Sequence, residues 1–93
     1  MQLIADVQRP CRVPGYRTEI LDDEIILFNP ESRAIFHSNS AGALIWALCD
    51  GQRTVADIIR LVSDSYPKAA DQIPDDVREA LAVFAQHGAI QWG

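Results

Sequence analysis

Residues that mark several protein classes are scarce in this chain. Only two cysteines occur, Cys11 and Cys49, too few for a disulfide framework. No apolar run approaches the length of a membrane span, and Asp6 soon interrupts the opening MQLIA, so we identify no signal peptide. We therefore expect a cytoplasmic protein that does not enter a membrane.

Basic residues are also few. The chain has one lysine, Lys68, and 13 acidic against 8 basic residues, which gives a net charge of −5. Nucleic-acid binding rests mainly on Lys and Arg side chains that neutralise phosphates, so this charge disfavours a nucleic-acid partner. An acidic domain accepts a neutral or basic peptide more readily.

No catalytic or metal-binding motif is present. His37 and His87 are the only histidines, and with Cys11 and Cys49 they form no metal-ligand spacing such as a CxxC pair. The five glycines stand apart, so there is no phosphate-binding loop, and no nucleophile elbow occurs. We expect a binding module with no cofactor and no metal rather than an enzyme.

The chain's central feature is the stretch Ser40–Thr54, SAGALIWALCDGQRT. Its apolar residues recur at helical spacing and predict a half-buried helix. Asn39 or Ser40 is expected to cap the first turn, and Asp50-Gly51 to end the helix. Trp46 lies slightly off the apolar face and is wide enough to reach a neighbouring element. Cys49 is expected to be a buried, reduced thiol.

Residues 1–15 are expected to form an arm with a short strand at Leu3–Val7. Pro10, Pro14 and Gly15 are expected to interrupt any other regular element there. With 93 residues, 48% of them apolar, we expect one compact domain spanning residues 1–93.

Three short segments before the central helix have the composition of strands. Tyr16–Leu21 and Glu24–Phe28 flank Asp22-Asp23, which favours a hairpin. The second run is apolar on both faces, as in a middle strand covered on two sides. Asn29–Ser32 predicts a turn, and Ala34–Ser38 is expected to be the third strand, at the edge of an antiparallel meander.

Two further helices are predicted after the central one. Thr54 and Asp57 form a capping box at the start of the second helix, which we expect to end at Tyr66-Pro67. Pro74 suits the first position of the third helix, and Gly88 its end. The two apolar stripes comprise Val55, Ile58, Ile59 and Val62, and then Val77, Ala80, Leu81 and Phe84.

The connections of the third helix are also predicted. Lys68–Ile73 is expected to be a polar connection, and Asp75-Asp76 suits the positive N-terminal end of the helix. Ala89–Trp92 is expected to form either a last short strand or a tail packed on the core.

Four segments resemble the PqqD-like family, which comprises pyrroloquinoline quinone biosynthesis protein D and the wider recognition elements of ribosomally made, modified peptides. They are VPGYR (Val13–Arg17), IILFNPE (Ile25–Glu31), NSAGALIWALCDGQRTVADII (Asn39–Ile59) and DVREALAVFAQHGAI (Asp76–Ile90). The resemblance implies an α+β, winged helix-turn-helix-like fold with a three-stranded antiparallel meander followed by three helices.

The resemblance also implies a function. Such domains are peptide chaperones: the leader of a precursor peptide adds as a strand along the third strand, in a groove beside the third helix. The bound peptide is presented to a modifying enzyme, often a radical SAM protein, in biosynthesis of pyrroloquinoline quinone or another modified peptide. The peptide-binding residues carried over to this sequence are Ala34, Ile35, Phe36, His37, Ser38, Arg78, Leu81, Ala82 and Ala85.

Alternatives remain for several of these residues. Arg78 could pair with an acidic leader residue or be a solvated helix charge, Ile35 could be ordinary core, and His37 could be a solvent-facing strand residue. Ser38 stands where many members carry an aliphatic residue. Small alanines on the third helix would leave room for ligand side chains.

Alternatives also remain for the function and the assembly. The runner-up to peptide binding is a winged-helix DNA-binding regulator, and a small enzyme or redox protein using Cys11 is a third class. An open strand edge would also permit a homodimer formed by strand exchange.

Overall fold

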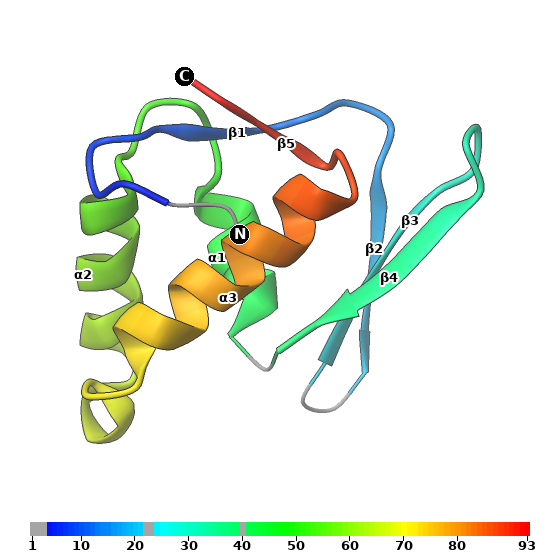
Figure 1. The fold of residues 1–93 in the computed structure, drawn as a ribbon. Coiled ribbons are helices and arrows are strands. Elements are labelled where there is room, and N and C mark those ends of the chain that lie inside the picture. Colours follow the sequence, from blue (N-terminus) through cyan, green and yellow to red (C-terminus); the bar gives the residue numbers. More distant parts are fainter. Residues whose placement is uncertain (1–3, 22–23, 40) are drawn as a thin grey trace.

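The computed structural model describes residues 4–21, 24–39 and 41–93. Along the chain, a group of strands comes first, the helices follow, and one further strand ends the fold (Figure 1). They are β1 (Pro10–Arg12), β2 (Arg17–Leu21), β3 (Glu24–Asn29), β4 (Ala34–Ser38), α1 (Gly42–Leu48), α2 (Val55–Ser65), the short 3-10 helix η1 (Pro67–Ala69), α3 (Ile73–Gln86) and β5 (Ile90–Trp92). The predicted α+β architecture is confirmed.

Strands β2, β3 and β4 form the predicted antiparallel meander, with β3 in the middle. The register places Thr18 opposite Leu27 and Leu27 opposite Phe36. In Figure 1 the three helices lie to the left of this sheet and none lies to its right. We call the face toward the helices the inner face and the opposite one the outer face. The predicted hairpin turn at Asp22-Asp23 lies outside the described residues.

The core lies between the inner face and the helices. Ile25 and Leu27 of β3 are buried there, together with the apolar stripes of α2 and α3. On the outer face, Ile26 and Phe28 of β3 are only half-buried. The expectation that β3 is covered on two sides is therefore wrong for the outer face, because all three helices lie on the inner side of the sheet (Figure 1).

The N-terminal arm differs most from expectation. Among described residues 4–7 there is no strand, and the first strand instead begins at Pro10 and pairs with β5. Proline is tolerated because it is the first residue of a strand in a separate two-stranded sheet. In Figure 1, β1 and β5 run side by side along the top of the molecule. The last segment is therefore a strand.

The helix boundaries are mostly those predicted. Thr54 Oγ1 accepts a hydrogen bond from Asp57 N at 3.1 Å, and Asp57 Oδ2 accepts one from Thr54 N at 3.1 Å, which completes the capping box. Gly51 has φ 77°, a left-handed conformation that suits glycine, just after α1. The connection before α3 contains the unpredicted η1.

Capping of α1 by Asn39 is wrong. The N-cap is Ala41, without a side-chain hydrogen bond, and the Asn39 amide is used elsewhere. The alternative cap, Ser40, lies outside the described residues.

Candidate functional site

Strand β4 is an edge strand in the part of the chain that the structure describes. Its residues pair with β3 over Ala34–Ser38, and the strand order β2-β3-β4 gives it no second neighbour. No other backbone hydrogen bond is found for these five residues within the described ranges. Alternate residues of such a strand direct N–H and C=O groups away from their neighbour, so β4 has free hydrogen-bonding capacity.

The side chains of β4 alternate between the two faces of the sheet. Phe36 is buried on the inner face with 6% of its surface exposed, and Ser38 is half-buried on the same face. Ile35 and His37 project from the outer face, where Ile35 is 67% exposed. Its interpretation as ordinary core is therefore wrong. His37 faces solvent and its Nδ1 lies 3.0 Å from Glu24 Oε2.

Helix α3 and its C-cap residue touch the β4 region at two points, just after the strand and at its middle residue. Near the end of β4, Asn39 Nδ2 donates to the Asp76 carbonyl oxygen at 3.0 Å. Farther back along the strand, the Phe36 ring stacks on the His87 ring, with centroids 4.1 Å apart and an interplanar angle of 3°. Phe84 lies behind them, its centroid 6.2 Å from that of Phe36. These contacts fix the position of α3 relative to the open edge.

An aromatic cluster supports this arrangement from the core side. Tyr16 lies 6.1 Å from both Phe36 and Trp46, centroid to centroid, and its hydroxyl donates to the His87 carbonyl oxygen at 2.9 Å. Trp46 meets Phe84 edge to face at 5.2 Å, so it does reach a neighbouring helix as predicted. Three elements or their ends, those of β2, α1 and α3, thus hold the inner side of β4 in place.

The helix residues expected to contact a peptide are not all beside β4. Arg78 Nη2 lies 2.6 Å from Asp6 Oδ1 of the arm, and Leu81 is fully buried in the core. At about 100° per residue, Arg78, Ala82 and Ala85 lie roughly 120–160° around the α3 axis from the nearer of Asp76 and His87. The structure therefore does not bring these three together with β4, and peptide contact by them stays a prediction.

Sequence reasoning missed His87 and Val83 as candidate site residues. Asp76, Val83 and His87 are spaced i, i+7, i+11, which puts them on one stripe of α3 and its C-cap, and the two ends of this stripe contact Asn39 and Phe36. Val83 is half-buried and packs against the core, while His87 is exposed. The i, i+7, i+11 spacing is visible in the sequence, but the periodicity alone does not say which flank of the helix faces the sheet.

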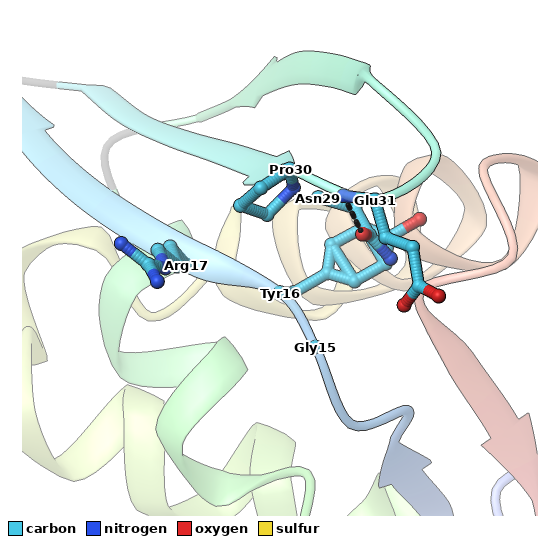
Figure 2. A pocket seen from close by; sticks show the side chains of 6 residues that line it. All are labelled: Gly15, Tyr16, Arg17, Asn29, Pro30 and Glu31. Atoms are coloured by element: carbon cyan, nitrogen blue, oxygen red, sulfur yellow. Dashed lines mark hydrogen bonds between the residues drawn. The ribbon is translucent and has the colours of Figure 1, made fainter.

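Two hollows lie elsewhere on the surface. One, of about 370 Å³, lies where β2 begins and β3 ends, and is lined by Gly15, Tyr16, Arg17, Asn29, Pro30 and Glu31 (Figure 2). There Asn29 Oδ1 accepts a hydrogen bond from Glu31 N at 3.0 Å, part of the predicted turn. The other, of about 310 Å³, is lined by Tyr66, Pro67, Lys68 and Ala69. Neither is lined by β4 or α3.

The described ranges hold no group of three or more His, Cys, Asp or Glu side chains able to bind a metal. Cys49 is buried and reduced as predicted, and burial raises the pKa of its thiol to about 12. Cys11 is exposed and also free. Within the same ranges, no helix has the length and apolar character needed to span a bilayer.

Comparison with known proteins adds to this geometry. The family model described as "Coenzyme PQQ synthesis protein D (PqqD)" matches residues 24–90. The PqqA binding protein of Rahnella aquatilis is 36% identical over 95 residues, which cover 99% of this chain and 93% of that protein. The PqqA binding protein of Klebsiella pneumoniae (strain 342) is 35% identical over 74 residues, 77% of each chain.

The fold also matches a solved structure. TbiB1 in complex with the TbiA(beta) leader peptide superposes with a TM-score of 0.65 at 18% identity, covering 87% of this chain and 94% of that chain.

Proposed function

The chain belongs to the family of coenzyme PQQ synthesis protein D, and from that premise we propose that it binds the leader region of a ribosomally made precursor peptide. The peptide adds as a fourth strand along β4, antiparallel or parallel to it, and the domain itself does no covalent chemistry. The observation that carries the proposal is the open edge of β4, which stands next to the α3 stripe of Asp76, Val83 and His87.

The relatives indicate the kind of ligand. Two of them carry the name PqqA binding protein, and the solved structure with the matching fold was determined with a leader peptide. We infer that PqqA, or a precursor peptide in an equivalent pathway, is the partner of this chain. The pathway is the biosynthesis of pyrroloquinoline quinone or of another modified peptide.

Strand addition is physically sufficient for specific binding. Main-chain hydrogen bonds to the free groups of β4 supply affinity, and alternate peptide side chains supply specificity. Three such bonds at a net gain of about 1 kcal/mol each correspond to roughly a hundredfold in affinity. On the inner side, alternate peptide residues would approach Phe36, Val83 and His87, so we expect apolar residues there.

The proposal assigns the chemistry to a separate protein. We propose that the domain presents the bound peptide to a peptide-modifying enzyme, with a radical SAM protein as the expected class. The described residues contain no metal-binding cluster, Cys49 is buried, and Cys11 is an exposed free thiol. The domain's contribution is then to hold the peptide in an extended conformation.

Duplex DNA is a poorer partner for the same fold. A recognition helix needs a basic face, but α3 carries Asp75, Asp76 and Glu79, and its Arg78 is paired with Asp6. We therefore favour the peptide as the ligand. A gel shift on duplex DNA at low salt is expected to show no complex.

The test uses two synthetic peptides as probes: PqqA of Rahnella aquatilis and the leader encoded beside this chain's own gene. Titration into the isotopically labelled chain is followed by amide hydrogen exchange. Protection is expected at alternate residues of Ala34–Ser38 when the tighter peptide binds. A tight complex that leaves all five amides unprotected would refute strand addition.

A matched pair of peptides sharpens this test. N-methylation of every second peptide residue removes the N–H groups directed at β4, whereas methylation of the intervening residues removes N–H groups that face away. One series is expected to lose affinity by about a hundredfold, since about three hydrogen bonds disappear, and the other to bind nearly as the parent does. Equal loss in both series would contradict the proposal.

A second copy of the chain could use the same edge. In a strand-exchanged homodimer the β4 groups would be paired between copies, so we propose that peptide binding and such exchange exclude each other. Sedimentation with and without the peptide tests this. The peptide is expected to convert any such dimer to monomers.

A further inference from the structure

We infer that the peptide is also read on the outer face of the sheet. There an aliphatic peptide side chain packs on Ile35, and a Lys or Arg two residues away faces Glu24 and His37. This inference rests on the proposed strand addition at β4. On this inference, the outer face selects among peptides by contacts that are separate from those on the inner side, beside α3.

The first step comes from the strand register. Arg17, Phe28 and Ile35 lie opposite one another across β2, β3 and β4, and all three project from the outer face. Phe28 is half-buried between its neighbours, whereas Ile35 is 67% exposed because the row ends at the open edge. A peptide strand about 4.8 Å beyond β4 would add a fourth residue to this row and cover Ile35.

Exposure alone does not single out Ile35. Ile20 of β2 is 66% exposed, but the register places it on the inner face and at the opposite edge of the sheet. It is therefore far from a strand added to β4. Ile35 combines an exposed aliphatic side chain with a position at the edge that the peptide would occupy, beside the half-buried Phe28.

The second step concerns the neighbouring row. Ile26 lies opposite His37, and His37 Nδ1 lies 3.0 Å from Glu24 Oε2, with the two side chains 65% and 56% exposed. His37 thus holds a carboxylate on the outer face near the open edge, in a chain of net charge −5. A peptide residue opposite His37 would find this carboxylate within reach of a Lys or Arg side chain.

The two rows fix a spacing. Residues that face the same side of a strand are two apart, so the aliphatic and basic peptide residues are separated by one residue. In an antiparallel complex, the commoner pairing, the basic residue precedes the aliphatic one. The intervening residue points to the inner face, toward Phe36.

The aliphatic contact is tested by a double-mutant cycle with the tighter of the two synthetic peptides. Alanine replaces each aliphatic peptide residue in turn, and binding is measured to the parent chain and to Ile35→Ala. One of these peptide replacements is expected to weaken binding to the parent chain about tenfold. The same replacement should change the affinity for the Ile35→Ala chain little. In the control, Ile20→Ala, the same replacement retains its full effect.

The basic contact is tested with Glu24→Gln, which keeps a hydrogen-bond acceptor for His37 and removes the charge. At low salt we expect affinity to fall about threefold and to depend less on ionic strength. The effect should vanish when the basic peptide residue two positions from the aliphatic one is replaced by Gln. Glu19→Gln, on the outer face of the far strand, is the control and should bind as the parent.

Failure of this inference is separable from failure of the proposed function. If β4 amides are protected but no peptide residue couples to Ile35 or Glu24, the outer-face contacts are refuted and strand addition stands. The inference is also refuted if the control Ile20→Ala changes peptide binding as Ile35→Ala does, or if the control Glu19→Gln changes it as Glu24→Gln does. Absence of β4 protection refutes the proposed function itself.

Discussion

Asn39 connects the open strand to α3, and its substitution by aspartate gives the sharpest test of that connection. Its Nδ2 donates to the Asp76 carbonyl oxygen at 3.0 Å, and its Oδ1 is buried without a hydrogen-bond partner. Asn39→Asp preserves shape but replaces the donor with an oxygen that faces the carbonyl. The contact between β4 and α3 changes from attractive to repulsive.

The cost follows from the groups involved. Loss of the hydrogen bond costs about 1 kcal/mol, and leaving the introduced carboxylate unpaired in a buried place adds about 1–3 kcal/mol, so we expect Asn39→Asp to lower the free energy of unfolding by about 2–4 kcal/mol. At about 4–8 °C per kcal/mol, the Tm falls by about 8–32 °C. Asn39→Ala, the control, removes only the bond and costs about 1–2 kcal/mol.

Urea unfolding at several pH values checks this reasoning. Burial beside a carbonyl oxygen raises the pKa of the introduced carboxyl in the folded chain above its value in the unfolded chain. Its destabilising effect is therefore smallest at low pH, where the protonated carboxyl can donate, and grows as pH rises through that raised pKa. If Asn39→Asp is as stable as the parent at pH 7, or less harmful than Asn39→Ala at every pH, the connection is not as described.

Three further predictions concern other parts of the fold. Thr54→Ala removes the capping box and should lower the free energy of unfolding by about 1 kcal/mol, whereas Thr54→Ser should keep most of it; equal losses would contradict the capping role. An aromatic disulfide reagent at pH 8 should modify only Cys11 in the native chain, because burial raises the pKa of Cys49 to about 12. After denaturation the reagent should modify both thiols. Prompt reaction of Cys49 in the native chain would contradict its burial. Hydrogen bonds from the Thr54 backbone and side chain, followed by Arg60's charge, lower the Asp57 pKa, so its stabilising contribution is present above the unfolded-state pKa and is lost as pH falls through the folded one. Tm measured from pH 7 to pH 2.5 should fall less steeply for Asp57→Asn than for the parent, with Asp64→Asn, an exposed residue of the same helix, as the control; identical slopes for the parent and Asp57→Asn would refute this.

Elements defined by local patterns were predictable from the sequence. The capping box and the helix ends depend on residues within a few positions of one another, such as Thr54 with Asp57 or Gly51 after α1, and the meander pairs only strands that follow one another in the chain. Edge-strand status also followed, because consecutive short strands with tight turns form a meander whose last member has one neighbour.

Elements that depend on distant partners were not predictable. β1 has a weak strand composition, since it begins at Pro10, and exists because β5 pairs with it. The sequence allowed Arg78 to be interpreted as a solvated or a ligand-binding charge. In the structure it forms an ion pair with Asp6, which is distant in the chain. His87 is a candidate site residue only because the fold stacks it on Phe36. The apolar stripe of α3 identified its buried side, but the flank facing β4 is set by how the helix crosses the sheet.

The pairing of β1 with β5 has a consequence for how the domain is made. Residues 17–38 contain every strand of the meander, whereas residues 10–12 must wait for residues 90–92 before they can pair. During synthesis on the ribosome, the sheet that bears β4 can form from nearby contacts well before the clasp between the two ends closes. A nascent chain would thus display the unpaired edge of β4 to neighbouring nascent chains before the pairing of β1 with β5 completes the fold.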